Sequence, residues 1–449
     1  MSTVLAKVLC IVVTLCALGV VAPRSTAAAE WTVMVYLNAK NNLEPDGIDN
    51  FYDMSSIGST ADVNVVVQMG RPKEHYDERD EAWSGVMRFL VKKGTKPRAG
   101  EALQDLAKDG ENTDMGSPET LARFIEWSMS KFPAKRYFVI VWNHGQGWRF
   151  QLAKDRNVKG RAAASRGQQI TADERKQLEA LTARVPPLGG FRSVSHDEDT
   201  GSILYNRQIQ TVLESKFSGR QLELLGFDAC LMSMVETAYA FRRAAAVMVA
   251  SEELEPTAGW PYKAWLAALI KDPTKDAPAL GKLVVDAYRD RYGNDRLTTL
   301  SSIRLSEVHE LGQSISTLGR SMKDNLLAEA NIIADVRSQV RPYGQQVRLK
   351  TSIDLQHFLD LYQAKTGHAA IRSAIEDVKT KLASVVLANY RSKQSDKPYG
   401  SHGLAIYFPA SRKDFLDDPN SSGYQKNAEH PVEFVENEAW GDFLRAYLK

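Results

Sequence analysis

The chain has 449 residues, of which 43% are hydrophobic and 25% are charged, and its formal net charge is +2. This is the composition of a globular protein, and the nearly balanced charges, without a basic stripe among aromatic residues, argue against a nucleic-acid partner. The length suits about two domains. After the first thirty residues no run is apolar and long enough to span a bilayer, so we expect no membrane contact in the mature protein.

Residues 1–29 have the pattern of a signal peptide. Lys7 precedes an apolar stretch, which ends before a run of small residues that suits a signal peptidase. The stretch is shorter than the ~20 residues that a membrane-spanning helix needs. Cys10 and Cys16 would leave with this segment. We therefore expect a secreted or periplasmic protein in which Cys230 is the remaining cysteine.

Strands and helices are predicted to alternate through the first half of the chain. Apolar, β-branched runs of strand length are separated by segments with helical spacing. The strands are expected at 31–37, 62–68, 85–91 and 137–142, and the helices at 44–57 and after an N-cap at Ser117. The runs are continuously apolar, which is typical of strands covered on both faces. The sequence therefore predicts an α/β/α sandwich with a mainly parallel sheet.

Two polar motifs follow the carboxyl ends of predicted strands. His144 comes after the strand at 137–142, and Cys230 comes after an apolar run at 222–228. Ligands bind at the carboxyl ends of strands in open α/β sheets, so the two side chains would meet if their strands are neighbours. A histidine can then take the thiol proton, which is worth roughly 10²- to 10⁴-fold in rate. A helical pattern begins at Leu231, and a helix N-terminus would favour the thiolate.

Other interpretations of these residues stay open at this point. Cys230 is equally explained as a small buried hydrophobic residue, which is the role of most free cysteines. His402 also precedes a glycine, but it stands before its apolar run at 404–408 and so at the opposite end of a strand. The Cys-x-x-Cys, His-Glu-x-x-His and Gly-x-Ser-x-Gly motifs do not occur, which disfavours thiol–disulfide oxidoreductases, zinc hydrolases and α/β-hydrolases.

The two motifs resemble those of a known family. Asn-His-Gly-Gln-Gly-Trp at 143–148 and Gly-Phe-Asp-Ala-Cys-Leu-Met-Ser-Met-Val-Glu at 226–236 are similar to the signatures of the clostripain-like cysteine peptidases, which are relatives of caspases, legumains and gingipains. The resemblance runs from about residue 31 to near the carboxyl end and is weakest between 150 and 195. It implies a caspase-like α/β/α fold and an exported cysteine endopeptidase that acts on peptides or proteins.

The resemblance also implies roles for single residues. His144 and Cys230 would form the catalytic dyad, and the backbone N–H groups of Gly145 and Cys230 would form the oxyanion hole, a device typically worth ~3 kcal/mol. Asp228 would line the pocket for an arginine or lysine before the cleaved bond, or else cap the following helix. Basic-specific relatives carry a second acid where this chain has Ala258, and the loss of one carboxylate should weaken binding of a basic side chain.

A third apolar run ends just before Ser251, Glu252 and Glu253, which are expected at the same rim of the sheet. Ser251 and Glu252 are candidate contacts to the substrate, with surface acids as the alternative. Trp260 and Tyr262 are expected to pack beneath the cleft or to form its wall. A catalytically silent peptide-binding protein on the same scaffold is the alternative function, although the presence of both dyad residues argues against it.

Residues 153–199 have a basic composition of their own and are predicted to form an insert, with one helical piece near 171–183. Relatives cut themselves between the histidine and the cysteine, so we expect the same here, with a solvated surface insertion as the alternative. The peptidase core is expected at 30–300, and a mostly helical C-terminal region, packed on the core, at 301–449.

The implied chemistry requires no cofactor. Some relatives are calcium-activated, so calcium stays open as a ligand. The candidate oxygens are those of Asp197, Glu198 and Asp199, but their spacing is not that of an EF-hand loop.

Overall fold

A computed structural model describes residues 28–149, 194–293, 297–344, 351–392, 400–426, 428 and 432–449. Most of the predicted signal peptide, the larger part of the predicted insert and the helix expected at 171–183 lie outside these residues. The first strand begins at Ala29, the last residue of the predicted signal peptide.

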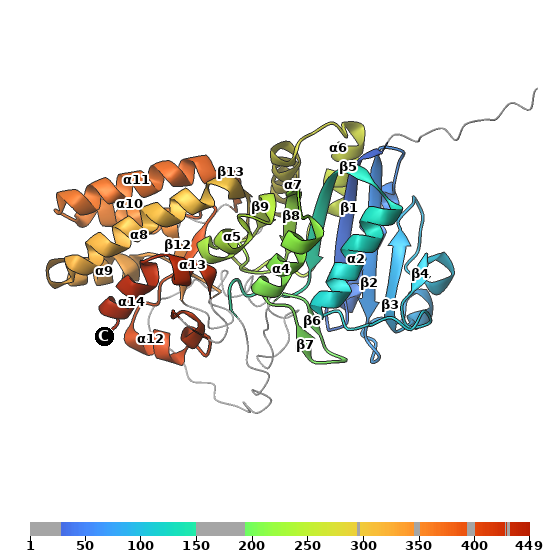
Figure 1. The fold of residues 1–449 in the computed structure, drawn as a ribbon, viewed down its shortest axis with the longest axis horizontal. Helices are drawn as coiled ribbons and strands as arrows, with labels where there is room; N and C mark the ends of the chain where they lie inside the picture. Colours follow the sequence, from blue (N-terminus) through green and yellow to red (C-terminus); the bar gives the residue numbers. More distant parts are fainter. Residues whose placement is uncertain are drawn as a thin grey trace, which may run out of the picture.

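A nine-stranded sheet forms the centre of the fold, in the order β13-β10-β9-β8-β5-β1-β2-β3-β4 (Figure 1). Its central strands β2, β1, β5, β8 and β9 run parallel, and antiparallel strands extend both edges. The prediction of a mainly parallel α/β sheet is confirmed. The strands are β1 (Ala29–Asn38), β2 (Val63–Arg71), β3 (Gly85–Leu90), β4 (Gln104–Asp105), β5 (Ala134–Trp142), β8 (Leu222–Asp228), β9 (Ala245–Ala250), β10 (Thr299–Arg304) and β13 (Val386–Arg391).

Helices cover both faces of this sheet, because successive strand residues point apolar side chains to opposite sides. Val139 and Ile140 are neighbours in β5 and belong to separate hydrophobic cores. One core includes α2 (Pro118–Lys131), α4 (Asn206–Lys216) and α5 (Val235–Phe241). The other includes α1 (Glu44–Ile57), α6 (Tyr262–Lys271) and α7 (Ala277–Tyr292). Figure 1 shows α2 and α4 in front of the strands.

The chain after residue 300 adds to the sheet as well as packing against it. β10 spans residue 300, where the core was expected to end, and β13 forms the far edge of the sheet. A helical layer lies beyond it on the left of Figure 1. It contains α8 (Val308–Asp324), α9 (Leu326–Gln339), α10 (Leu355–Lys365), α11 (Ala369–Val385), α12 (Arg412–Asp417), α13 (Glu433–Asn437) and α14 (Trp440–Tyr447).

Two small sheets complete the described fold. β11 (Pro342–Tyr343), β12 (Ser352–Asp354) and β14 (Ala405–Tyr407) pair antiparallel in one of them, and β14 is the late strand that the sequence indicates. The other is a hairpin of β6 (His196–Asp197) and β7 (Ser202–Ile203), directly after the undescribed part of the insert.

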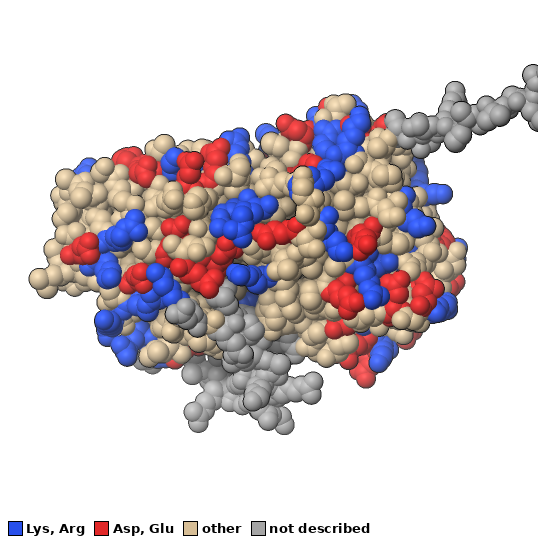
Figure 2. Space-filling view, in the orientation of Figure 1, with Lys and Arg blue, Asp and Glu red and all other residues tan. Residues whose placement is uncertain are grey.

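The surface carries mixed charges. Lys and Arg side chains lie among Asp and Glu side chains over the face shown in Figure 2. Among the helices of the described segments, none has the length and apolar character needed to cross a bilayer.

Candidate active site

The structure brings His144 and Cys230 into one cavity. β5 and β8 are parallel neighbours in which Trp142 lies opposite Asp228, and each of the two candidate residues follows two positions later. Both line a cavity of about 50 Å³ at this rim. One water needs roughly 10–15 Å³, so the cavity has room for several waters or for the end of a side chain.

His144 is held from both its backbone and its ring. Its N–H donates to Asn143 Oδ1 at 2.6 Å, and its Nε2 lies 3.0 Å from Asn42 Oδ1. A carbonyl oxygen accepts, so this contact places the ring proton on Nε2 and leaves Nδ1 as the basic nitrogen. Burial lowers the pKa of His144 to about 4. The imidazole is therefore neutral near pH 7 and able to accept a proton.

Cys230 does not stand at a helix N-terminus, so that part of the sequence prediction is wrong. α5 begins only at Val235, because Leu231 turns the chain with a left-handed φ of 62° and donates its N–H to Glu253 O at 3.1 Å. Burial, and to a smaller extent nearby carboxylates, raise the pKa of the Cys230 thiol to about 12, although the Glu255 N–H, 3.3 Å from Sγ, acts in the opposite direction. The resting group is therefore a thiol.

Gly145 packs directly on the backbone of Cys230. A Cβ atom added to Gly145 would lie 2.4 Å from Cys230 O, 2.9 Å from Ala229 Cβ and 3.0 Å from Cys230 N. No real side chain approaches backbone atoms this closely, so only glycine fits. The backbones of the two predicted oxyanion-hole residues are thus in contact.

Asp228 is fixed at the base of the cavity. It is only 4% exposed, and its Oδ2 accepts from the Trp260 N–H at 3.1 Å and from the Tyr262 hydroxyl at 2.9 Å. It does not cap α5, whose N-cap residue is Met234, so the capping alternative is wrong. Trp260 and Tyr262 are fully buried and support Asp228 from below, as expected for packing residues.

Ser251 and Glu252 follow β9 as predicted, but they are buried and do not line the cavity. The Ser251 hydroxyl lies 2.9 Å from Thr299 Oγ1, and Glu252 Oε2 accepts from the Gly403 N–H at 3.0 Å. Glu253 binds Arg341 at 2.6 Å. Burial contradicts the alternative that these residues are surface acids. A direct contact of Ser251 or Glu252 with the substrate stays a prediction.

His402, the competing histidine, lies in a different environment. Its Nδ1 is 2.9 Å from Asp354 Oδ1, and its backbone N–H donates to Asp354 Oδ2 at 2.6 Å. His402 precedes β14 in the small three-stranded sheet and is not among the residues that line the cavity. The choice of His144 over His402 thus agrees with the described geometry.

Sequence reasoning missed two residues of the site, Asn42 and Glu255. Asn42 lies between β1 and α1 and contacts the ring of His144. Glu255 lies in the loop after β9, lines the cavity and donates its backbone N–H to Cys230 Sγ. The available signal was position: both residues lie in loops at the carboxyl ends of parallel strands.

Replacing Asn42 by alanine is expected to lower kcat/KM roughly 10- to 100-fold, because a hydrogen bond to a charged group is worth about 1.5–3 kcal/mol and the His144 ring becomes charged during the reaction. Asn42→Asp keeps the acceptor and adds a negative charge, which favours imidazolium. Its acid limb of kcat/KM is therefore expected at higher pH than in the wild type. Steady-state kinetics from pH 4 to 8 measure both effects, and an unimpaired Asn42→Ala enzyme would exclude this role.

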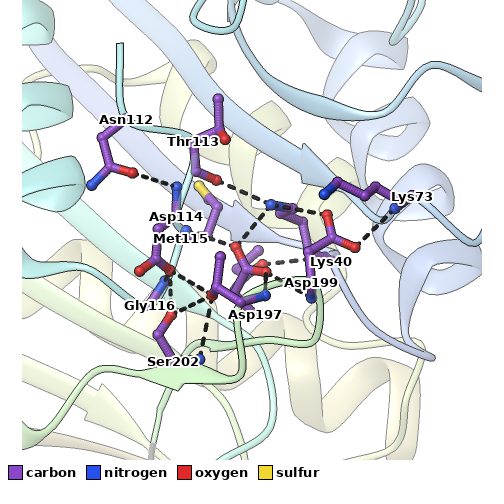
Figure 3. A network of polar contacts seen from close by, with 12 residues as sticks. Lys40, Lys73, Asn112, Thr113, Asp114, Met115, Gly116, Asp197, Asp199 and Ser202 are labelled. Atoms are coloured by element: carbon purple, nitrogen blue, oxygen red, sulfur yellow. Dashed lines mark hydrogen bonds and ion pairs between the residues drawn. The ribbon is translucent and has the colours of Figure 1, made fainter.

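The described end of the predicted insert is tied to the loop after β1 by a buried ion cluster, shown in Figure 3. Lys40 Nζ lies 2.9 Å from Asp197 Oδ2, 3.1 Å from Asp199 Oδ2 and 3.1 Å from Thr113 O. Lys40 is 2% exposed and Asp197 is fully buried. Burial raises the pKa of Asp197, although Lys40 and the Met115 N–H act in the opposite direction.

The residues of this cluster are not arranged to bind calcium, although they include the candidate ligands Asp197 and Asp199. Oxygens of Asp197 and Asp199 that a cation would take already bind the Lys40 ammonium, and the remaining oxygens accept backbone N–H groups of Lys73, Asp199 and Thr200. Glu198 Oε2 instead accepts from the Tyr76 hydroxyl. Lys40 therefore supplies the positive charge that these carboxylates need.

A cluster of amide groups connects the β6–β7 hairpin to the loop that carries His144. Asn143 Nδ2 donates to Asn38 O at 2.7 Å, and Asn41 Nδ2 donates to His196 O at 3.0 Å. The His196 N–H in turn donates to Asn143 Oδ1 at 3.2 Å. The position of the histidine loop thus depends on chain segments before and after residues 150–193.

Comparisons with known proteins identify the family of the chain. The sequence model of the Clostripain family matches residues 35–178 and 190–447. Clostripain of Hathewaya histolytica is 21% identical over 428 residues, which are 86% of this chain and 75% of that protein.

Two solved structures share the fold along nearly the whole chain. An inactive protease zymogen from Parabacteroides distasonis has a TM-score of 0.56 at 18% identity and covers 93% of this chain and 98% of its own. A secreted cysteine protease from Bacteroides thetaiotaomicron, in complex with an irreversible peptide inhibitor, has a TM-score of 0.56 at 17% identity and covers 91% and 100%. The fold is thus the caspase-like α/β/α sandwich that the sequence motifs imply. The chain belongs to the clostripain family and is a cysteine endopeptidase.

Proposed function

We propose that the protein is an exported endopeptidase in which Cys230 attacks the scissile carbonyl, His144 transfers the proton and Asp228 selects arginine or lysine. The observation that carries the proposal is the single cavity lined by His144, Cys230 and Asp228 at the carboxyl ends of β5 and β8. A nucleophile, a neutral base and an acid for a basic side chain are the groups that this reaction needs.

The proposed reaction starts from a neutral pair. With thiol and imidazole pKa values of about 12 and 4, an ion pair is not favoured before the substrate arrives. The Cys230 proton passes to His144 Nδ1 as the sulfur attacks the carbonyl carbon. The resulting imidazolium returns the proton to the leaving amine, and a thioester remains. Water, deprotonated by His144, then hydrolyses the thioester and regenerates the thiol.

The developing oxyanion is stabilised in this proposal by the N–H groups of Gly145 and Cys230. The packing of Gly145 on Cys230 supports this assignment, because a side chain at position 145 would separate the two backbones. Fixed donors of this kind are typically worth ~3 kcal/mol in the transition state. The thiolate formed after proton transfer also has the Glu255 N–H as a donor. Every step uses groups of the chain itself, and calcium enters none of them.

Export and self-processing belong to the same proposal. The signal-peptide pattern at 1–29 motivates export. The basic insert at 153–199 lies between His144 and Cys230 in sequence, and an enzyme that cleaves after basic residues would find its own target there. The candidate targets are the Lys and Arg residues of the insert, from Lys154 to Arg192.

A panel of peptide amides that differ only in the residue before the cleaved bond tests this function. We expect purified protein to release arginine and lysine substrates, and Cys230→Ala to release none and to remain one chain on a denaturing gel. Turnover of acidic or apolar substrates instead would overturn the role of Asp228. Binding of peptides without any turnover would favour the silent peptide-binding protein.

A further inference from the structure

Asp228 is not the only carboxyl group at the base of the cavity. Glu255 lines the same cavity, and the carboxyl groups of Asp228 and Glu255 hydrogen-bond to each other. They come from different elements, because Asp228 ends β8 whereas Glu255 lies in the loop after β9. Two carboxyl groups in contact must share a proton or bind a cation between them.

One carboxyl oxygen of Glu255 lacks a donor in the described segments. Its Oε1 accepts from Trp260 Nε1 at 3.4 Å. Its Oε2 is buried and receives no hydrogen bond from an N–H or hydroxyl group in the described segments. Asp228 Oδ2 is already bound by the Trp260 N–H and the Tyr262 hydroxyl. A cationic side chain that enters the cavity would bring the donors that Glu255 Oε2 lacks.

The backbone of Glu255 contacts the reacting sulfur, so this residue lies beside the nucleophile. The Glu255 N–H is 3.3 Å from Cys230 Sγ. Ala258, where basic-specific relatives have an acid, has no charge to offer, and its carbonyl accepts from Asn50 Nδ2 at 2.8 Å. The second carboxyl group in this cavity thus comes from a position three residues earlier in the same loop.

We propose that Glu255 is a specificity-determining residue, which forms with Asp228 a two-carboxylate site for the cationic side chain before the cleaved bond. The inference rests on the proposed function, since it assumes that this cavity receives that side chain. A guanidinium group has donors on two edges, so it can bind both carboxylates at once. An uncharged side chain has no means of replacing the proton that the pair shares.

Cation binding by this site displaces the shared proton. Burial, together with the neighbouring acid, raises the pKa of Glu255 well above its usual range, and burial raises the pKa of Asp228 to about 6. The pair therefore holds a proton at low pH and releases it more readily as the pH rises. Affinity for a cationic side chain is expected to increase from pH 5 to 7, across the lower of the two macroscopic transitions of the pair.

Other titratable groups near the pair do not mimic this transition. Burial raises the pKa of Cys230 to about 12, and His144 titrates at about 4. Glu253 binds Arg341 and lies outside the residues that line the cavity. The tyrosines whose electrostatics involve the pair all have pKa values raised above 10 by burial: Tyr262, Tyr288 and Tyr292.

The test compares two substrates that differ by one charge. Peptide amides with arginine or with citrulline, its uncharged analogue of nearly equal shape, are assayed with the full chain and with Glu255→Gln. We expect the arginine-to-citrulline ratio of kcat/KM to fall roughly 10- to 100-fold in Glu255→Gln, since a hydrogen bond to a charged group is worth about 1.5–3 kcal/mol. The loss is expected mainly in KM. The ratio is measured within one enzyme, so a partly unfolded preparation does not change it.

The pH dependence adds an independent measurement. In the wild type the arginine-to-citrulline ratio is expected to rise from pH 5 to 7, and in Glu255→Gln the rise is expected at lower pH, because Asp228 no longer shares its proton with a second acid. Glu74→Gln, which removes an exposed acid outside the cavity, is the matched control and should leave the ratio unchanged.

The outcomes separate the two proposals. An unchanged ratio in Glu255→Gln, with wild-type preference for arginine intact, overturns the role of Glu255 and leaves the proposed function standing. Equal cleavage of arginine and citrulline peptides by the wild type overturns the basic specificity itself. A fall in both substrates by the same factor would assign Glu255 a structural or catalytic role instead of a role in specificity.

Discussion

The Cys230→Ala variant is expected to hydrolyse peptide bonds roughly 10⁴- to 10⁶-fold more slowly than the wild type, because removal of a nucleophile eliminates the covalent route entirely. His144→Ala should cause a loss of similar size, since without the imidazole the thiol, with a pKa of about 12, has lost its proposed proton acceptor. The two losses are not expected to add in the double variant, because both residues serve one step. Single-turnover kinetics on an arginine peptide amide measure these losses.

Alkylation of the resting enzyme tests the neutral pair directly. The rate of reaction with iodoacetamide should rise about tenfold per pH unit from pH 6 to 9, because the thiolate fraction grows in that proportion below a pKa of about 12. A preformed thiolate–imidazolium pair would instead react at a nearly constant rate over this range. Cys230→Ala is the control, since Cys10 and Cys16 belong to the predicted signal peptide.

Replacing Lys40 by methionine is expected to lower the free energy of unfolding by about 3–5 kcal/mol, which is typical when one partner of a buried ion pair is removed. Methionine has a similar length and fills the space, so the loss reports mainly the charge. Asp197 is fully buried and would remain without its cation. Urea unfolding measures the change, with wild type and variant compared in the same form, either both processed or both unprocessed.

A second variant distinguishes the charge from the packing. Lys40→Met combined with Asp197→Asn removes both charges and should recover part of the lost stability, because a neutral pair has no charge to desolvate. If Lys40→Met alone costs less than about 1 kcal/mol, the cluster is not a stabilising anchor. Arg123→Met, which removes a half-exposed cation that pairs with Glu119, is the matched control.

The position of His144 and Cys230 at the rim of the sheet could be predicted from sequence, because it depends on local apolar runs. Apolar runs before His144 and Cys230 are strands whichever order they take in the sheet, and parallel strands bring their carboxyl ends to one edge. The late start of α5 could not be predicted. Helical spacing from Leu231 onward is real, but tertiary bonds to Glu253 and to β14 hold residues 231–234 outside the helix.

The second carboxylate was equally hidden from sequence reasoning. Ala258 suggests that one acid is missing, because motif positions are compared one by one. Glu255 reaches the cavity only because the loop after β9 folds back over Cys230, with its N–H against the sulfur. Asn42 is likewise brought to His144 by the pairing of β1 with β5 and not by any pattern of its own.

The strand order has a consequence for any nick between residues 150 and 193. β5 lies upstream of such a nick and β8 downstream, yet they are adjacent, with five paired positions from Phe138 to Trp142. Each product would contribute strands to the same hydrogen-bonded sheet and side chains to both hydrophobic cores. They should therefore co-elute as a single particle in size-exclusion chromatography and come apart only when the whole domain is denatured.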